Sequence, residues 1–250
     1  YNFDMQNIFF DTRILDKKSR EKFYLTEELM MENAAQELES CVMPHVFHES
    51  SRYINRPCVL ILAGRGNNGA DGYVLARRLS CHDFCVAVCC IGEPSSEIAK
   101  VQKKRAELLG VSFISPYDLD SFVEEKSFDI SVVVDCVYGS GFHLPLDAES
   151  EAVIQSANKI EAFKVSCDVP SGLDSDGNGK IVFRADETVA MGALKLSLFS
   201  DKAKDFCGKV KVCNLGISRN NFEFLETPDA FLLEKEEMKL PFRKMQNVHK

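Results

Sequence analysis

Long apolar runs, an excess of positive charge and an export signal are all missing from this sequence of 250 residues. No apolar run approaches the roughly 20 residues that a helix needs to cross a bilayer. The amino end also lacks the charged, apolar and small-residue segments of a secretory signal. Acidic residues outnumber basic ones by 38 to 30, whereas a protein that binds nucleic-acid backbones needs clustered lysine and arginine. We therefore expect a cytoplasmic protein that has no membrane and no nucleic acid as partner.

Cysteines at metal-binding spacing are missing as well. The ten cysteines form no Cys-x-x-Cys pair and no cluster with histidine at the spacing of zinc ligands. A free thiol in an apolar run behaves as a small hydrophobic side chain, and a reducing compartment is the simplest explanation of this usage. The cysteines in apolar, strand-like runs are Cys58, Cys85, Cys89, Cys136, Cys167 and Cys213.

The most informative segment is the glycine-rich loop at 63–72, which reads Ala-Gly-Arg-Gly-Asn-Asn-Gly-Ala-Asp-Gly. The preceding run, 58–63, is apolar without alternation, as in a central parallel strand that is covered on both faces. The following run, 73–79, has apolar residues at helical spacing. A strand, a glycine turn and a helix together present free backbone N–H groups and the positive end of a helix dipole to an anion. The segment therefore predicts a phosphate or cofactor cradle.

Taken alone, this loop matches neither common nucleotide-binding fingerprint. Its three glycines, Gly64, Gly66 and Gly69, are followed by an Ala-Asp-Gly that is unusual for the dinucleotide motif. No Gly-Lys-Ser/Thr follows, so it is not a P-loop. A tight turn whose glycines serve only packing is the alternative.

Two further strand-like runs end in the same kind of residues. One leads into Asp135 and the glycine loop 136–145, and the other leads into Asp168 and the turn 169–174. In open α/β sheets, ligands bind beyond the carboxyl ends of the strands. We therefore expect the three loops to border a single crevice.

Strand-like and helix-like segments alternate along most of the chain, which indicates parallel βαβ units with right-handed crossovers. The fold class that follows is α/β: a Rossmann-like three-layer α/β/α sandwich with a mostly parallel central sheet. Helices are expected at 19–42, 73–79, after Ser96, at 117–126 and at 149–159, and strands at 58–63, 84–91, 111–114, 130–135, 163–168, 181–183, 187–191 and 210–214.

Several motifs in a fixed order closely resemble those of the YjeF N-terminal domain family, the NAD(P)HX epimerases. They are Gly-Asn-Asn-Gly-x-Asp-Gly at 66–72, Val-Asp-x-x-x-Gly-x-Gly at 134–141 and Asp-Val-Pro-Ser-Gly-Leu-Asp at 168–174. With weaker matches before and after them, the likeness covers about residues 20 to 217. Several motifs in order are strong evidence, whereas any single one is weak. One departure is Ala70, where the family usually has glycine.

The resemblance also divides the chain. It assigns residues 1–240 to the YjeF N-terminal domain and residues 241–250 to a linker or to the start of a missing C-terminal dehydratase domain. An ADP- or ATP-dependent NAD(P)HX dehydratase, fused or separate, is thus an expected partner, and a homodimer is expected from the family.

The resemblance implies an isomerase of nicotinamide cofactor repair. NAD(P)HX is hydrated NADH or NADPH with a hydroxyl group at carbon six of the ring, and the family interconverts its R and S epimers so that a stereospecific dehydratase can repair both. Backbone donors of the first two loops suit the pyrophosphate. The substrate-binding residues that follow are Asn67, Asn68, Gly69, Ala70, Asp71, Gly139, Ser140, Gly141, Phe142, His143, Leu144, Pro145 and Asp168.

Potassium is the cofactor that the resemblance implies, with Asn68, Asp135 and Ser171 at the matching positions. Their oxygens are hard ligands, which suit a hard cation and not zinc. Asp168 matches a substrate-contacting acid, and we expect it to be the catalytic proton-transfer residue, since a carboxylate can give and take a proton within hydrogen-bond reach. The alternative for Asp168 is a turn carboxylate that bonds the N–H groups of residues 171 and 172.

Several other side chains stay open at this point. Lys195 is either a phosphate partner or proton donor near the pocket, or a solvent-facing lysine at a strand end. Tyr138 either lines the pocket or serves packing, and His143 either contacts substrate or is a polar loop residue. Cys136 has no adjacent histidine, which argues against nucleophilic catalysis.

Two other functions compete with the epimerase. Some relatives of this domain act in RNA-decapping scaffolds or bind proteins, so a shared fold does not settle function. Such scaffolds can lose ligands, whereas Asn68, Asp71, Asp135, Asp168 and Ser171 are all present here. An ordinary nicotinamide dehydrogenase is disfavoured by the lack of an evident acid or base for hydride transfer.

Overall fold

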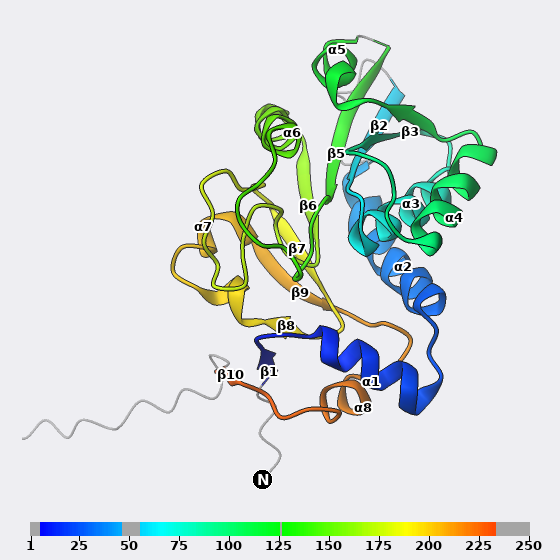
Figure 1. Cartoon of the computed structure of the whole chain (residues 1–250). Coiled ribbons are helices and arrows are strands. Elements are labelled where there is room, and N and C mark those ends of the chain that lie inside the picture. The colour runs from blue at the N-terminus through cyan, green and yellow to red at the C-terminus, as the bar shows by residue number, and fades with distance from the viewer. Residues whose placement is uncertain (1–5, 47–55, 126, 234–250) are drawn as a thin grey trace, which may run out of the picture.

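The computed structural model describes residues 6–46, 56–125 and 127–233. Its main sheet has seven strands in the order β4-β3-β2-β5-β6-β7-β9, and every neighbouring pair is parallel (Figure 1). The predicted parallel central sheet is therefore confirmed. The strands are β2 (Arg56–Ala63), β3 (Cys85–Cys90), β4 (Ser112–Ile114), β5 (Phe128–Cys136), β6 (Phe163–Cys167), β7 (Glu187–Met191) and β9 (Lys209–Cys213).

The strand order reverses between β2 and β5. From β2 the chain moves outward to β3 and β4, and it then returns to the other side of β2 and continues from β5 to β9. Helices on either side of such a reversal leave a crevice at the carboxyl ends of the two strands. This topology fixes where a ligand site is expected.

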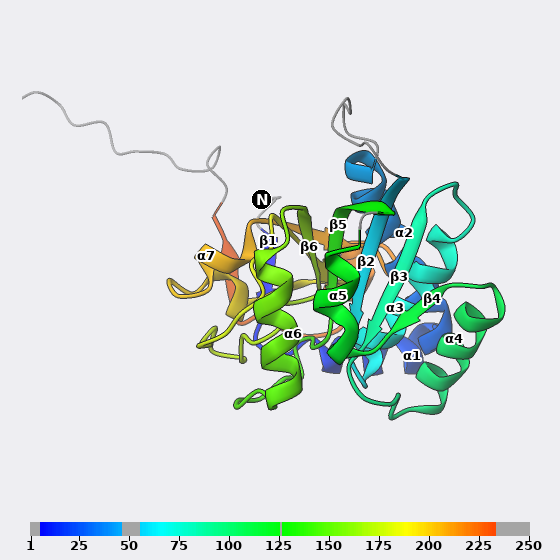
Figure 2. The same ribbon diagram turned by 90° about the horizontal axis from the view of Figure 1, so that it is seen from above.

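Helices cover both faces of the sheet. One face carries α2 (Glu27–Val46), α3 (Asn67–Leu79) and α4 (Glu97–Leu108), and the other carries η1 (Pro116–Asp118), α5 (Leu119–Val123) and α6 (Ala148–Lys159). Figure 2 shows α5 and α6 in front of the sheet and α2 behind it. Side chains alternate along β2, so Ile61 packs in the same core cluster as Leu38 of α2, whereas Leu60 packs with Ile154 of α6. The three-layer sandwich is thus confirmed.

A second, three-stranded sheet joins parts of the chain that are far apart in sequence. Strand β1 (Gln6–Phe9) pairs in parallel with β8 (Leu194–Lys195) and antiparallel with β10 (Ala230–Leu232). Phe9 lies opposite Lys195 in this register. The short sheet therefore holds Lys195 at the edge of the main sheet. The remaining elements are α1 (Arg13–Phe23), η2 (Leu196–Phe199), α7 (Lys204–Cys207) and α8 (Arg219–Glu223).

The structure corrects three of the expected elements. The helix expected at 19–42 is two helices, because Tyr24 has a left-handed φ of 56° that ends α1, and the Thr26 hydroxyl accepts from the Leu29 N–H as a new N-cap does. Residues 181–183 form no strand, and the Phe183 N–H donates to the Ser171 carbonyl instead. The helix expected at 117–126 is the shorter η1 and α5.

Two further expectations concern the ends of the chain and membranes. Residues 241–250, expected to be a linker or the start of another domain, lie outside the described residues. Within the described ranges, no helix has the length and apolar character needed to span a bilayer.

Candidate functional site

A cavity of about 510 Å³ lies at the carboxyl ends of β2 and β5, where the strand order reverses. The loops after β2 and β5 contribute to its wall, and Asp168 at the end of β6 does as well, whereas the turn 169–174 is not part of the lining. Helix α1 adds two charged residues. The lining residues are Arg13, Asp16, Gly64, Arg65, Gly66, Asn67, Asn68, Asp71, Ile91, Val137, Tyr138, Gly139, Ser140, Gly141, Phe142, Asp147, Asp168 and Met191.

The glycines of the first loop allow close backbone packing. The Gly64 N–H donates to the Cys136 carbonyl at 3.0 Å. A Cβ at Gly64 would overlap the Val137 carbonyl, and a Cβ at Gly69 would overlap the Gly64 carbonyl. These contacts press the loop after β2 against the loop after β5. Packing is therefore one real function of these glycines, and it also fixes the mouth of the cavity.

Helix α3 points its amino end into the cavity. Gly66 is the N-cap, and Gly66, Asn67 and Asn68 line the wall. The first N–H groups of a helix have no partner within the helix, and the helix dipole is positive at this end. Ala70, the departure from the family pattern, is buried in the helical backbone of α3, where its methyl group is tolerated. The first turn of α3 thus offers the N–H groups and the dipole charge that an anion needs.

Asp168 is held in the cavity by its backbone and by three donors. It follows β6 with a left-handed φ of 72°, a conformation that aspartate adopts more readily than most residues. Its Oδ2 accepts from the Ser140 N–H at 2.8 Å, and its Oδ1 accepts from the Met191 N–H at 3.1 Å. The Lys195 ammonium lies 2.5 Å from Oδ1. The carboxylate therefore has a fixed position and orientation.

These donors decide the protonation of Asp168. Burial by itself raises its pKa, but the Lys195 ammonium and the backbone N–H groups outweigh burial and hold the pKa below 3.8. Lys195 is only 1% exposed and also donates to the Met191 carbonyl at 2.5 Å, so the solvent-facing alternative for it is wrong. Asp168 is consequently a carboxylate at neutral pH.

Asp135, and not Asp168, accepts the hydrogen bond from the Ser171 N–H in the turn after β6. Its Oδ2 accepts from the Ser171 N–H at 2.8 Å and its Oδ1 from the Ser171 hydroxyl at 2.6 Å. Burial raises the pKa of Asp135 to about 6, although these bonds and the Val137 N–H oppose the shift. The Asn68 amide, which donates to the Cys167 carbonyl, comes from the facing helix end. In the part of the chain that the structure describes, no group of three or more His, Cys, Asp and Glu side chains is arranged to hold a metal ion.

Two more carboxyl groups face the same cavity. Burial raises the pKa of Asp16 from 3.8 to about 6, and it raises the pKa of Asp71 well above its ordinary value. The Asp168 carboxylate adds to both shifts. A second cavity of about 310 Å³ adjoins the first, and Arg13, Asp16, Asn67, Asp71 and Met191 line both. The apolar part of its wall comes from Met30, Met31, Ala34 and Leu215.

The predicted substrate-binding residues divide into two groups. Asn67, Asn68, Asp71, Gly139, Ser140, Gly141, Phe142 and Asp168 line the cavity. Gly69 and Ala70 are buried within α3, while His143, Leu144 and Pro145 are exposed beyond the lining. Tyr138 lines the wall, and its hydroxyl also bonds Asp147 and Ser150.

Sequence reasoning missed the cavity residues Arg13, Asp16, Arg65 and Met191. Arg13 and Asp16 are three residues apart, which places them on one face of a helix. The sequence shows this spacing, but no local sequence pattern indicates that this face of α1 is turned toward the crevice. Arg65 stands between two glycines of the first loop and is exposed at the mouth.

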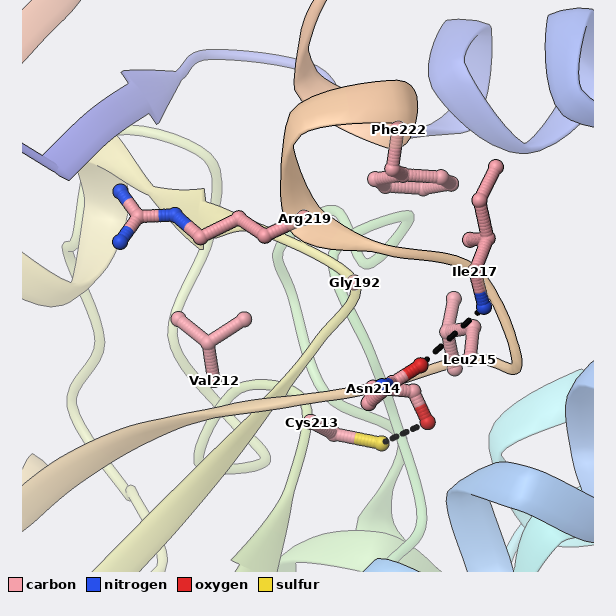
Figure 3. Close-up of a pocket in the computed structure, with 8 residues that line it drawn as sticks. All are labelled: Gly192, Val212, Cys213, Asn214, Leu215, Ile217, Arg219 and Phe222. Atoms are coloured by element: carbon pink, nitrogen blue, oxygen red, sulfur yellow. Dashed lines mark hydrogen bonds between the residues drawn. The ribbon is translucent and has the colours of Figure 1, made fainter.

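Another cavity, of about 260 Å³, lies beneath α8 (Figure 3). Its wall is mainly apolar, with Val212, Leu215 and Phe222. The Asn214 side-chain oxygen accepts from the Ile217 N–H, and Arg219 pairs with Glu223. Because its polar groups serve local structure, it is a weaker candidate than the cavity at β2 and β5.

Comparisons with known proteins identify the family. The family described as YjeF-related protein N-terminus matches residues 27–197. The chain belongs to the YjeF N-terminal family. The matched range of this YjeF N-terminal chain contains all three loops and Lys195, whereas α1, with Arg13 and Asp16, lies before it.

Curated relatives extend the match. The chain is 38% identical over 247 residues to the bifunctional NAD(P)H-hydrate repair enzyme Nnr of Helicobacter pylori, covering 98% of this chain and 50% of that protein. It is 36% identical to the NAD(P)H-hydrate epimerase of Oenococcus oeni, covering 67% of this chain and 78% of that one. This YjeF N-terminal chain thus spans about half the length of the bifunctional relative.

A solved structure supports the fold. The crystal structure of yeast ynu0 matches with a TM-score of 0.71 and 17% identity, covering 92% of this chain and 98% of that one. At this identity the likeness shows the shared α/β fold of the YjeF N-terminal chain and nothing finer.

Proposed function

We propose that this chain interconverts the R and S epimers of hydrated NADH and NADPH as a NAD(P)H-hydrate epimerase. The names of the Oenococcus oeni and Helicobacter pylori relatives support the reaction. The observation that carries the proposal is the buried Asp168 carboxylate, which Lys195 fixes in a cavity at the strand-order reversal. A fixed, charged carboxylate beside an anion site is what a proton transfer on a phosphate-bearing substrate requires.

The two tasks of the site fall to different residues. The first turn of α3 and the guanidinium of Arg65 hold the phosphate groups, through backbone N–H groups and charge. Asp168 accepts the proton of the hydroxyl group at carbon six and later returns it. Because the Ser140 N–H donates to one of its oxygens and the Met191 N–H to the other, the carboxylate cannot rotate away from the substrate.

Potassium is part of the proposal. The donors at the matching positions are the amide oxygen of Asn68, the carboxylate of Asp135 and the hydroxyl of Ser171, a hard, all-oxygen set. The Asp135 carboxyl group is fully buried, which raises its pKa to about 6, and a bound cation would relieve this cost of burying its charge. The set therefore fits a hard cation, which would supply a fixed positive charge next to the substrate. A test independent of activity is the melting temperature in potassium, sodium and tetramethylammonium chloride, where potassium should stabilise the wild type and not Asp135→Asn.

The partners and the location belong to the proposal too. Relatives in Helicobacter pylori and Archaeoglobus fulgidus are named as bifunctional repair enzymes, and the chain covers 50% and 43% of them. A dehydratase acting on the same hydrate, fused or separate, is the partner that this supports. A homodimer and a cytoplasmic location stay predictions from the sequence.

The experiment uses a mixture of R and S NADPHX with an S-specific dehydratase and its nucleotide, in potassium buffer. Without this protein, recovery of NADPH should slow once the S form is consumed. We expect the protein to make recovery fast and complete. No acceleration by folded protein would overturn the proposed function.

A further inference from the structure

Helix α1 presents one charged face to the two joined cavities. Arg13, Asp16 and Arg20 follow each other at spacings of three and four residues, which places them on one side of a helix. All three line the second cavity, and Arg13 and Asp16 line the first as well. Asp16 therefore stands at the wall that the cavities share, on an element different from the one that carries Asp168.

The arginines beside Asp16 are each engaged by another acid. Arg13 donates to both carboxylate oxygens of Asp11, at 2.8 and 2.7 Å, and Arg20 pairs with Glu27. Asp16 itself is half-buried. In contrast with Asp168, it is not held by a dedicated ammonium group.

The charged groups around Asp16 act in opposite directions. Lys195 and Arg20 favour its carboxylate, whereas Asp168 and Asp11 disfavour it. Asp71 lines both cavities as well, and the charge of Asp16 raises the pKa of Asp71. Burial is the largest influence and raises the pKa of Asp16 to about 6, while the pKa of Asp168 stays below 3.8. Two carboxyl groups whose surroundings push their pKa values apart, in one cavity, are the usual arrangement of an acid and a base.

We propose that Asp16 is a second catalytic residue, the acid that works opposite the base Asp168. The inference rests on the proposed epimerase function and deepens it. Asp16 lines the cavity that the substrate enters, so it reaches the reacting ring directly. Asp16 lies on α1, before the residues 27–197 that the family model matches, and still lines the cavity.

The proton transfers balance in a ring-opening step. Asp168 takes the proton of the hydroxyl at carbon six, the oxygen forms a double bond to that carbon, and the bond from carbon six to the ring nitrogen breaks. The electron pair of the broken bond stays on nitrogen, which takes the proton of the Asp16 carboxyl group. After rotation, nitrogen attacks the other face of the carbonyl, returns its proton to Asp16, and oxygen recovers its proton from Asp168. Nothing is oxidised or reduced.

The test compares Asp16→Asn and Asp16→Glu with the wild type, and Glu21→Gln serves as control because Glu21 is an exposed acid of the same helix. Loss of an acid catalyst typically costs about 10²-fold or more. We therefore expect the kcat of Asp16→Asn to fall by about that factor. Asp16→Glu keeps an ionisable proton, so its kcat should be at least about tenfold higher than that of Asp16→Asn. Glu21→Gln should match the wild type.

The pH profile separates a catalytic role from a structural one. In the wild type, kcat/KM should decline above a pH of about 6 as Asp16 loses its proton, and this decline should be absent in Asp16→Asn. The inference would be overturned if Asp16→Asn had the kcat of the wild type, the pH profile of the wild type, or the same kcat as Asp16→Glu. An inactive wild type would overturn the proposed function instead, so the two failures are distinguishable.

Discussion

Lys195 and Asp168 form a buried ion pair with 2.5 Å between Nζ and Oδ1. The two residues come from different sheets, since Asp168 follows β6 of the main sheet while Lys195 belongs to β8 of the small one. A buried pair is stabilising only when further hydrogen bonds satisfy both partners. The Met191 carbonyl and the N–H groups of Ser140 and Met191 do so here.

Removing the lysine should leave an uncompensated charge. For Lys195→Met we expect a loss of about 3–5 kcal/mol in the free energy of unfolding, since one partner of a buried pair is stranded. Urea unfolding at pH 7 measures this loss. In the double variant Lys195→Met/Asp168→Asn, stability should return toward the wild type while activity stays low. A single variant as stable as the wild type would contradict the pairing.

The two acids should affect stability in opposite pH ranges. The folded pKa of Asp168 is depressed, so its contribution is present above about pH 4 and is lost as pH falls through the folded pKa. The folded pKa of Asp16 is raised from 3.8 to about 6, so stability is lost as pH rises through this interval.

Asp16→Asn should therefore stabilise the protein at pH 7 while it lowers activity. The shift corresponds to an upper bound of about 3 kcal/mol, which residual contact with solvent reduces. Near pH 4 the gain should be small, because Asp16 is then protonated in the folded state and about half protonated in the unfolded state. Melting curves of the variant and the wild type at pH 4 and pH 7.5 check this, and an unchanged difference between the two pH values would speak against a raised pKa.

A methyl group at Gly139 should displace the Asp168 carboxylate. An ideal Cβ there lies 2.9 Å from Oδ2 of Asp168, whereas a Cβ at Gly66 meets nothing within 4 Å. We expect Gly139→Ala to lower kcat by about tenfold or more, since small misplacements of reacting groups are costly. The matched control Gly66→Ala should keep its fold stability. Equal stability and equal kcat in both variants would mean that Asp168 lies elsewhere.

Arg65 should contribute to substrate affinity rather than to chemistry. It lies at the mouth of the cavity, next to the amino end of α3. We expect Arg65→Gln to raise KM by about tenfold, as a charge-assisted hydrogen bond of about 1.5 kcal/mol does, with kcat nearly unchanged. Lys100→Gln on the exposed face of α4 is the control. A fall in kcat at constant KM would assign Arg65 to the chemical step.

The sequence allowed the strand ends to be recognised because local patterns mark them. Continuous apolar runs predicted β2, β5 and β6, and the acids Asp135 and Asp168 stand at their ends as expected. Parallel strands place such residues at a common edge, so one crevice could be inferred without knowing the pairing.

Other features depend on contacts that no local pattern contains. The pairing of β1 with the two-residue β8 joins residues almost 190 positions apart in the chain, and it is this pairing that positions Lys195. The face that α1 turns toward the cavity, and with it Asp16, also depends on tertiary packing. The break at Tyr24 was missed because a left-handed tyrosine is uncommon, although Thr26 before two glutamates is an N-cap signal.

The most direct test of the account starts from a single purified epimer. R-NADHX and S-NADHX are incubated separately with wild-type protein or Asp168→Asn, and the epimers are separated by chromatography over time. We predict that the wild type brings both samples quickly to the same mixture, and that Asp168→Asn does so at least about 10²-fold more slowly. Equal rates for wild type, Asp168→Asn and plain buffer would contradict it.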